Sequence, residues 1–473
     1  MPLPFDPSFS RRDFLIRAGA LAGVPALAPF AARPTPTPNT VRPPLSSMIT
    51  INRVDADFER EPLVRPFGFK GGYLTELWQS AALMESASGR HGIGLGTQSV
   101  LWSDARVFAS HAESGGNALM YALTEYALQR ANGMSFQTPI ALQEALLDDV
   151  YAYGQKITGH SDLRKTFALN ALVPVDNAAW VLYAAETGLR TFDAMIPAAY
   201  RPGLSHRHEQ VVSVPTIAYT IPVEEMEALA RQGYFFLKIK LGQPGTQAEM
   251  LAEDKKRLSA IHATLGPLET AHTAHGKLPY YFDANGRYET RETLLRLLDH
   301  ADQIGALEQI AVLEEPFPEN LHVDVSNLGV PVAADESAHT DEDVIQRIEM
   351  GYRVIALKAV AKTLSMTMKM AQAAHEHGAA CLCADLTVNP ILVDWNKNIA
   401  ARLAPLPGLQ AGLLETNGHQ NYSNWDRMVR YHPKAGASWT QVYEGLFQLD
   451  PSFYTESGGV LLPSEHYERL FQR

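Results

Sequence analysis

The sequence has very little cysteine: only Cys381 and Cys383 occur among its 473 residues. They lie two apart on one expected strand, so their side chains point the same way and are poorly placed to bond each other. A disulfide framework is therefore excluded. The chain also lacks an excess of positive charge, because its formal net charge is −12 and no stretch resembles a basic stripe. We expect no nucleic-acid partner.

A long hydrophobic run is missing as well. The Ala-rich apolar stretch at 18–32 is too short and too weakly hydrophobic for a stable membrane span. It follows an arginine pair at 11–12 and the dipeptide Phe14-Leu15, which is the pattern of a twin-arginine signal peptide. We predict such a signal over residues 1–32 and export of the folded protein to the periplasm. A chance arginine pair in a tail is the alternative.

The length predicts more than one domain. A βα barrel takes about 250 residues, so 473 residues leave room for a second domain. We expect a proline-rich linker at 33–47, an α+β domain at 48–205 and a barrel at 206–425. A C-terminal segment at 426–473 would pack back on the first domain.

The first expected domain has a mixed pattern. Helical periodicity marks 118–131, 142–158 and 177–187, and Asp176 is the expected N-cap of the last of these helices. The Gly-x-Gly-x-Gly segment at 92–96 invites interpretation as a nucleotide-binding loop. No helix with a phosphate-binding start follows it, so we assign this segment to a tight turn.

Short apolar runs alternate with helical segments in the second expected domain, which is typical of buried parallel strands in βα units. Five of these runs end at charged residues, and packing alone does not explain five charges on one rim. In a closed barrel, the rim at the C-terminal strand ends is where active sites are built. The expected strands are 214–220, 234–241, 279–282, 310–313, 330–334, 354–357, 379–385 and 409–415. The expected helices are 248–264, 291–303, 341–350 and 364–377, with one more that begins near Pro222.

Three of the charged strand ends are acidic. Asp283, Glu314 and Asp335 would project into one space, where unneutralised carboxylates repel one another and so require a cation. An all-oxygen donor set without His or Cys suits Mg²⁺, with Mn²⁺ as the alternative. Three separate salt bridges on the rim are the purely structural interpretation.

The other charged strand ends carry lysines. Lys238 and Lys240 lie two apart on one strand and face the same side, and Lys358 ends a strand four units later, across the barrel. Amines that flank a divalent cation have lowered pKa values, because nearby positive charge disfavours the ammonium form. Such a lysine can act as a general base near neutral pH. The plain alternative is that the lysines only balance the acids.

Taken together, these motifs resemble the enolase superfamily. The chain presents Lys-x-Lys, Asp-x-Asn, Glu-Glu-Pro, Asp-Glu-Ser and Lys in that order, most similar to the muconate-lactonising and dipeptide-epimerase branch. The resemblance covers roughly residues 214–415, and more loosely the first domain as the family's capping domain. It implies an α/β fold: an enolase-type modified (β/α)7-8 barrel with an N-terminal α+β capping domain.

The resemblance also implies roles for the residues that match. Mg²⁺ would be bound by the acidic set at 283, 314 and 335 and would hold a substrate carboxylate. Lys240 and Lys358 would be the acid/base pair on opposite faces of the α-carbon, and Lys238 would help to stabilise an enediolate. Asn285 and Glu336 would orient the ligands and lysines. One lysine per face gives a 1,1-proton transfer that inverts a stereocentre, as in an epimerase or racemase.

The sequence departs from the family pattern at the substrate. After the last lysine it runs Ala-Val-Ala-Lys362 instead of the Gly-Gly often found in epimerases, and Glu415 begins a Glu-Thr-Asn in place of Asp-x-Asp. Asp385 and Glu415 are candidates to bind a substrate amine or hydroxyl, or else each caps a loop. Phe69 is a further substrate-binding candidate, in a loop at 67–73 that either covers the site or is a plain surface loop.

Other functions use the same residues or lack support. The enediolate also serves β-elimination or cycloisomerisation, so a dehydratase, a muconate-lactonising enzyme or an o-succinylbenzoate synthase is the alternative to an epimerase of dipeptides or N-acyl amino acids. A sugar-acid dehydratase of the mandelate-racemase branch would have a His base where Lys358 stands. A non-catalytic periplasmic binding protein would have lost a base or a ligand, and none is missing. The sequence leaves open whether the chain forms the homo-oligomers that are frequent in the family.

Overall fold

The computed structural model describes residues 48–69 and 72–472, which belong to one compact unit. The predicted signal at 1–32 and linker at 33–47 lie outside the described residues, as does the side chain of Phe69. Within the described ranges, every helix is too short or too polar to cross a membrane.

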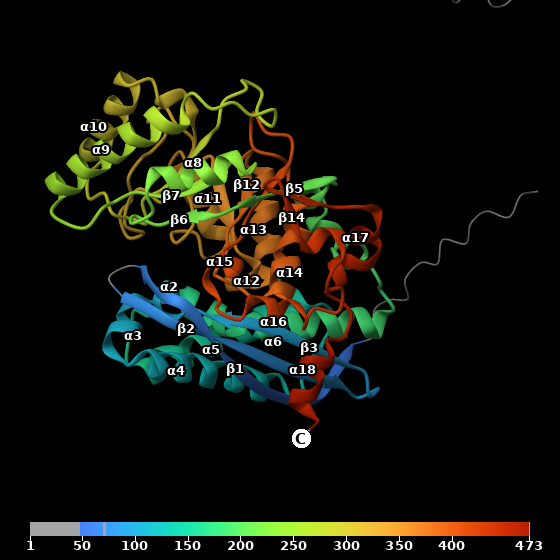
Figure 1. Ribbon diagram of the computed structural model, residues 1–473. Helices are drawn as coiled ribbons and strands as arrows, with labels where there is room; N and C mark the ends of the chain where they lie inside the picture. Colours follow the sequence, from blue (N-terminus) through green and yellow to red (C-terminus); the bar gives the residue numbers. More distant parts are fainter. Residues whose placement is uncertain (1–47, 70–71, 473) are drawn as a thin grey trace, which may run out of the picture. The chain divides into compact units, whose positions relative to one another are not determined.

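The first domain is built on an antiparallel sheet of order β3-β2-β1-β4 (Figure 1). The long strands β1 (Ile49–Phe69) and β2 (Gly72–Ser86) form a hairpin, and β3 (His91–Gln98) and β4 (Ser135–Phe136) flank it. Three helices lie beside the sheet (Figure 1). They are α4 (Glu113–Ala131), α5 (Pro139–Thr158) and α6 (Lys165–Thr187).

The Gly-x-Gly-x-Gly segment is a strand, and its assignment to a tight turn was wrong. It forms most of β3, which lies directly against α6. A Cβ atom added to Gly94 would lie 2.1 Å from the backbone nitrogen of Ala178 and from the carbonyl oxygen of Pro174. The glycines are needed because the strand and helix backbones approach too closely for any side chain.

The predicted N-cap at Asp176 was also wrong, because Asp176 lies in the middle of α6. Pro174 stands inside this helix, although proline normally marks a helix start or break. The Asp176 carboxylate accepts hydrogen bonds from the backbone N–H and the hydroxyl of Ser365. It therefore joins the first domain to the barrel domain through a buried polar contact.

The burial of Asp176 makes stability depend on pH. Burial raises the pKa of Asp176 from an ordinary 3.8 to about 7. The folded state therefore holds this proton more tightly than the unfolded state, and between those two values stability falls as pH rises, by at most about 1.4 kcal/mol per pH unit. Asp176→Asn cannot ionise, so in urea unfolding at about pH 5 and about pH 8 we expect the variant to lose less stability than the wild type. An equal loss in both proteins would show that Asp176 does not titrate in this range.

The second domain is a curled sheet of parallel strands that returns on itself. Pairing runs in order from β6 through β7 to β13 and on to β5, and only Pro215 separates β5 from β6, so the chain itself closes the ring. The strands are β5 (Gln210–Val214), β6 (Thr216–Ile217), β7 (Leu237–Lys240), β8 (Tyr280–Asp283), β9 (Ile310–Glu314), β10 (Val332–Ala334), β11 (Val354–Leu357), β12 (Ala380–Cys383) and β13 (Gly412–Glu415). The predicted α/β barrel with an N-terminal α+β domain is confirmed.

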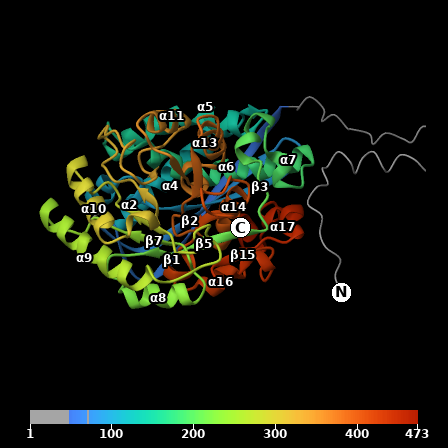
Figure 2. The same cartoon turned by 90° about the horizontal axis from the view of Figure 1, so that it is seen from above.

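Helices surround these strands when the molecule is seen from above (Figure 2). They are α8 (Val223–Arg231), α9 (Gln247–Leu265), α10 (Arg291–Gln303), α11 (Asp341–Glu349), α13 (Leu364–Glu376) and α14 (Pro390–Ala400). Hydroxyl side chains fix several helix starts, as where Thr246 and Glu249 form a capping box on α9. Between β9 and β10, the segment 315–331 forms turns and bends but no helix, so this βα unit lacks its helix.

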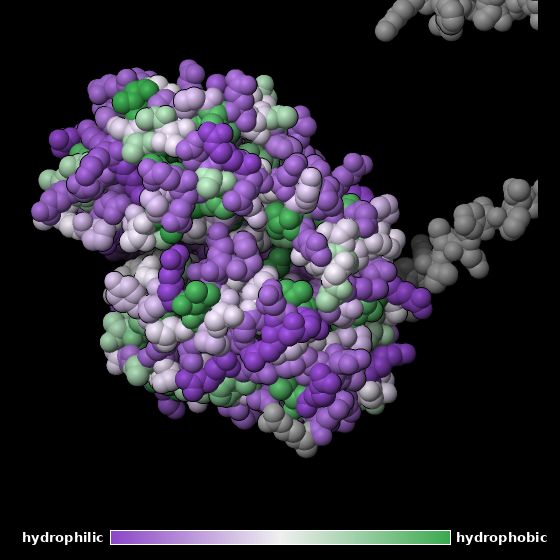
Figure 3. All heavy atoms as spheres, in the orientation of Figure 1, coloured by the Kyte–Doolittle hydropathy of each residue, from purple (hydrophilic) through white to green (hydrophobic). Residues whose placement is uncertain are grey.

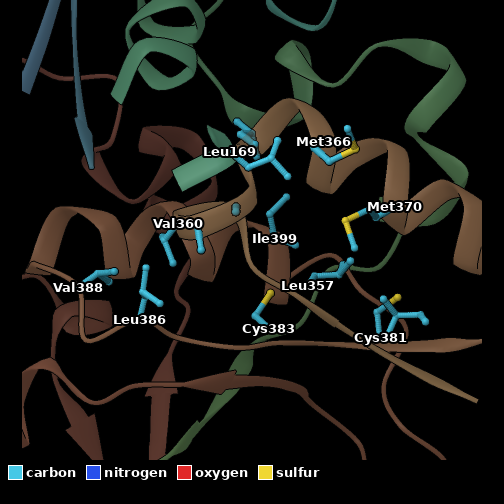
Figure 4. Close-up of a cluster of buried hydrophobic side chains, with 14 of the residues drawn as sticks. Leu169, Leu357, Val360, Met366, Met370, Cys381, Cys383, Leu386, Val388 and Ile399 are labelled. Carbon is cyan, nitrogen blue, oxygen red and sulfur yellow. The ribbon is translucent and has the colours of Figure 1, made fainter. Parts of the chain in front are cut away.

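The core between the strands and the outer helices is apolar. Leu357 of β11 packs with Met370 of α13 and Ile399 of α14 in the cluster shown in Figure 4. Cys381 and Cys383 belong to this cluster, where both are buried and free, as predicted.

The C-terminal segment contacts both domains. The short strand β15 (Leu446–Gln448) adds antiparallel to β5, beyond the ring. Further along, His466 lies 2.8 Å from the carboxylate of Glu59 on β1, and Glu468 lies 3.1 Å from His91 on β3. The end of the chain thus ties the barrel domain to the sheet of the first domain.

Candidate active site

Strand register brings the predicted residues together. Lys240 of β7 pairs with Asp283 of β8, and Asp283 pairs with Glu314 of β9. Asp335 follows the end of β10, which pairs with β9. Because all these strands are parallel, their C-terminal ends lie on one rim, and the side chains on it are buried.

Lys238 lies at the centre of the acidic groups. Its Nζ lies 3.0 Å from Asp283 Oδ2, 2.9 Å from Glu314 Oε1 and 3.1 Å from Glu415 Oε2. Burial alone would lower the pKa of Lys238, but the three carboxylates raise it well above its usual value. Lys238 is therefore a fixed positive charge, which suits it to stabilise an anion and not to remove a proton.

Lys240 lies two residues after Lys238 on β7, so its side chain faces the same space. Its Nζ donates to Asp283 Oδ2 at 2.6 Å and to Asn285 Oδ1 at 2.8 Å. The Asn285 amide also donates to Glu336 Oε1 at 3.2 Å, and its backbone N–H donates to Asp283 Oδ1 at 2.9 Å. Asn285 thus orients one lysine and two carboxylates at once.

Lys358 stands on the other side of the ring, directly after β11. Its Nζ lies 2.7 Å from Asp335 Oδ2 and 4.2 Å from the ring centre of Trp102. Trp102 belongs to α2 (Val100–Ser103) in the first domain, so that domain covers this lysine with an aromatic face. The indole N–H of Trp102 is buried and has no hydrogen-bond partner among the described residues.

A fourth lysine, Lys362, also reaches the acids, although its place in the sequence suggested no role for it. Its Nζ lies 2.7 Å from the backbone oxygen of Asp335 and 3.2 Å from Oδ1. Burial would raise the pKa of Asp335, but Lys358, Lys362 and Lys238 hold it well below its usual range. The signal in the sequence was the spacing, since a residue four positions after Lys358 on a helix faces the same way.

Tyr281 is a second residue that sequence reasoning missed. It precedes Asp283 by two positions on β8 and so faces the same side, and its hydroxyl donates to Glu314 Oε2. Burial and the neighbouring Asp283 raise the pKa of Glu314 well above its usual range. Without a bound cation, the positive charge of Lys238 therefore does not fully offset the negative charge of the Glu314 carboxylate.

The acids fit a hard cation. Carboxylate oxygens of Glu314, Asp335 and Glu336 all lie within 4.8 Å of one another, and oxygen donors at this spacing suit Mg²⁺. The sequence predicted Asp283 as a ligand and Glu336 as a residue that orients the ligands. In the structure Asp283 Oδ2 contacts Lys238 and Lys240, as the other predicted ligands also contact lysines, and its role as a ligand stays a prediction.

Asp385 and Glu415 accept hydrogen bonds from the loops around them. Glu415 accepts hydrogen bonds from Thr216 Oγ1 at 2.7 Å and from the Asn417 amide at 2.9 Å, in addition to its contact with Lys238. Asp385 accepts from the backbone N–H groups of Asn417 at 2.7 Å and Val388 at 3.4 Å. Both residues also line the inner cavity at the lysines and acids, so their contacts fit loop capping and their substrate-binding role stays a prediction.

Two neighbouring cavities serve the site. An inner cavity of about 60 Å³ is lined by the lysines and acids, by Trp102 and by Phe67. An outer cavity of about 790 Å³ shares Phe67 and Thr216 with it, and lies between the end of the β1–β2 hairpin and the segment 216–221. The surface in Figure 3 is hollowed between the two domains. Phe67, two positions before the predicted Phe69, lines both cavities.

Comparison with known protein families agrees with this geometry. Residues 222–407, most of the barrel domain, match the family described as "Enolase C-terminal domain-like". A search of curated proteins by sequence found no match.

Solved structures share the fold over nearly their whole length. A mandelate racemase/muconate lactonizing protein from Herpetosiphon aurantiacus is 18% identical, with a TM-score of 0.60 over 85% of this chain and 96% of that one. A dipeptide epimerase from Enterococcus faecalis V583, complexed with Mg and L-Leu-L-Tyr, is 16% identical, with a TM-score of 0.57 over 85% and 97%. An L-talarate dehydratase from Polaromonas sp. JS666, complexed with Mg and L-glucarate, is 18% identical, with a TM-score of 0.58 over 85% and 92%. The chain therefore has the fold of the enolase superfamily.

Proposed function

We propose that the protein is a Mg²⁺-dependent epimerase or racemase that removes the proton α to a carboxylate and returns it from the opposite face. The observation that carries this proposal is the placement of two lysines. Lys240 ends β7 and Lys358 follows β11, four strands further round the ring, and the acids and Lys238 lie between them.

The two lysines divide the proton transfer. One, in its amine form, removes the α-proton, and the electron pair of the broken C–H bond is delocalised into the substrate carboxylate as an enediolate. The other, as an ammonium group, donates a proton to the same carbon from the other face and so inverts it. Lys238 remains charged throughout and lies near the developing anion.

Glu314, Asp335 and Glu336 would hold the Mg²⁺, together with the predicted ligand Asp283, which pairs with Glu314 on the same rim. When bound, this cation supplies positive charge that fixes the substrate carboxylate and offsets the second negative charge of the enediolate. Asn285 positions Lys240 against the acids, and Trp102 keeps water from Lys358.

The outer cavity supports a dipeptide or an N-acyl amino acid as the substrate. Its volume of about 790 Å³ exceeds what a small hydroxy acid needs, and its lining offers amide and phenol groups with only one cation, Arg65, and one anion, Glu225, among the described residues. These groups suit the amide of a substrate better than a second carboxylate. The lining amides and phenols are Gln232, Gln243, Gln420, Asn421, Tyr73 and Tyr219.

A second candidate is a dehydratase or cycloisomerase on the same site. The likeness to an L-talarate dehydratase favours keeping it, since the two activities share every step up to the enediolate. A leaving group at the β-carbon would then decide the product.

The test uses the protein from about Arg33 onward, incubated with Mg²⁺ in D₂O and pools of dipeptides, N-acyl amino acids and sugar acids. Mass spectrometry and chiral separation would follow the products. Gain of one mass unit at the α-position with inversion is the expected result. Loss of water would assign a dehydratase, and ring formation without loss of water would assign a cycloisomerase. No change in any pool would contradict these substrate classes.

A further inference from the structure

Lys362 is a buried lysine that the proposed proton transfer does not use. Its relative exposure is 0%, and its Nζ is held by the backbone oxygen of Asp335 at 2.7 Å and by Oδ1 of the same residue at 3.2 Å. Burying an ammonium group completely is costly unless it is paired, so the position demands an explanation.

A single helical turn brings Lys362 close to Lys358. Both belong to one turn of helix, α12 (Ala359–Lys362), which Lys358 caps, and the backbone N–H of Lys362 donates to the carbonyl of Lys358 at 2.7 Å. The turn ends at Thr363, whose φ of 70° is in the left-handed region that favours glycine. The chain therefore accepts backbone strain at the residue that follows Lys362.

The two lysines hold different oxygens of Asp335. Lys358 donates to Oδ2 at 2.7 Å, whereas Lys362 contacts both Oδ1 and the main-chain oxygen. These two contacts with Lys362 fix the side-chain torsions of Asp335. The backbone N–H of Asp335 is in turn held by Glu315 Oε2 at 2.8 Å. Oδ2 is thus the oxygen that can exchange Lys358 for a cation while the rest of Asp335 stays in place.

We propose that Lys362 is a positioning residue of the metal site, which fixes Asp335 so that Oδ2 faces the cation and whose charge keeps the affinity for divalent cations low. This inference rests on the proposed Mg²⁺ site. A positive charge within hydrogen-bond distance of a ligand repels a dication, and with no exposure to solvent neither water nor salt screens that repulsion strongly. Removing the charge should therefore strengthen binding, whereas the loss of a purely structural residue would weaken it.

The chain offers a matched control in Lys397 on α14. This lysine is 1% exposed, and it is likewise held by one carboxylate, Asp394 Oδ1, and one backbone oxygen, that of Trp439 at 2.7 Å. It contacts none of the proposed metal-binding residues. Its replacement removes the same kind of buried charge away from the site.

The experiment measures the Kd of Mn²⁺, as a probe for Mg²⁺, by electron paramagnetic resonance of the free ion. The variants are Lys362→Met, which removes charge and donor, Lys362→Gln, which keeps a donor, and Lys397→Met. We expect Lys362→Gln, which removes the charge but keeps a donor to Asp335, to bind Mn²⁺ about tenfold more tightly than the wild type, and Lys362→Met, which also loses that contact, to gain less. Lys397→Met should lose stability without a change in Kd.

Unchanged or weaker Mn²⁺ binding in folded Lys362→Gln, or equal affinity in the two Lys362 variants, would overturn the inference. A crystal structure of the wild type with Mn²⁺ tests it without any substitution. The cation should contact Asp335 Oδ2 with Lys362 still on Oδ1, and a cation on Oδ1 with Lys362 displaced would also overturn it. If the wild type binds no divalent cation at all, the proposed function fails, which is a separate result.

Discussion

Replacing either Lys240 or Lys358 by alanine is expected to abolish interconversion of the two epimers and to leave each variant able to exchange the α-proton of one epimer only. Loss of a positioned acid or base costs about 10²–10⁴-fold in rate. The remaining lysine can still remove a proton from its own face and return a deuteron from D₂O to that same face. Retention with exchange in one epimer, and no exchange in the other, is the signature of one base per face.

The geometry explains why the two variants should be complementary. Lys240 is held from one side by Asp283 and Asn285, and Lys358 from the other by Asp335 and the ring of Trp102. Neither lysine is within the hydrogen-bond set of the other, so losing one leaves the other positioned. Proton NMR of each purified epimer in D₂O would measure the exchange.

Lys369→Ala is the control for this pair. Lys369 lies on α13 outside the ring, where it pairs with Glu144 and Asp341, each at 3.2 Å. It should keep full activity. If Lys240→Ala and Lys358→Ala both exchanged the same epimer, the two lysines would not act on opposite faces, and a mechanism with a single base would replace the proposed one.

The residues on the barrel rim were predictable from the sequence because parallel strands impose a simple rule. A charged residue at the end of a short apolar run must lie on the rim, whatever the helices between the strands do. Asp283, Glu314 and Lys358 could therefore be placed together from sequence, and residue 281 was within reach by the two-residue strand period. Helix α10, which begins after Thr290 as its N-cap, matches its predicted bounds because its signals are local.

The failures all depend on contacts between segments far apart in the sequence. The glycines of β3 were taken for a turn because only the backbone of α6, about 80 residues later, shows why they lack side chains. Asp176 was taken for a cap because its partner, Ser365, lies 189 positions away. The two roles offered for Asp385 and Glu415 stayed open for the same reason, since the hydrogen bonds to them come from Asn417 and Thr216, 32 and 199 positions away.

Glu314→Gln is expected to abolish both activity and Mg²⁺ binding while the metal-free protein stays folded. Glu314 lies between Lys238 Nζ at 2.9 Å and the other two carboxylates of the proposed cation site. Changing a group behind the ligands of a metal costs about 10–100-fold in affinity, and the loss of a charged ligand itself should exceed that. Isothermal titration with Mg²⁺ would measure it.

The stability of the metal-free Glu314→Gln variant should not fall with its Mg²⁺ affinity. A urea unfolding measurement therefore distinguishes the loss of a ligand from a loss of folding. Burial raises the pKa of Glu314, so at neutral pH the ionised carboxylate costs stability in the metal-free protein, and that cost disappears in the uncharged glutamine. We expect the metal-free variant to unfold in urea at a denaturant concentration no lower than the wild type does.

Asp385→Asn is the matched control for Mg²⁺ binding, because Asp385 is another buried carboxylate at the same site but accepts hydrogen bonds from backbone N–H groups. Asp385→Asn should bind Mg²⁺ with the affinity of the wild type. If Glu314→Gln also kept the wild-type affinity, Glu314 would not be a ligand.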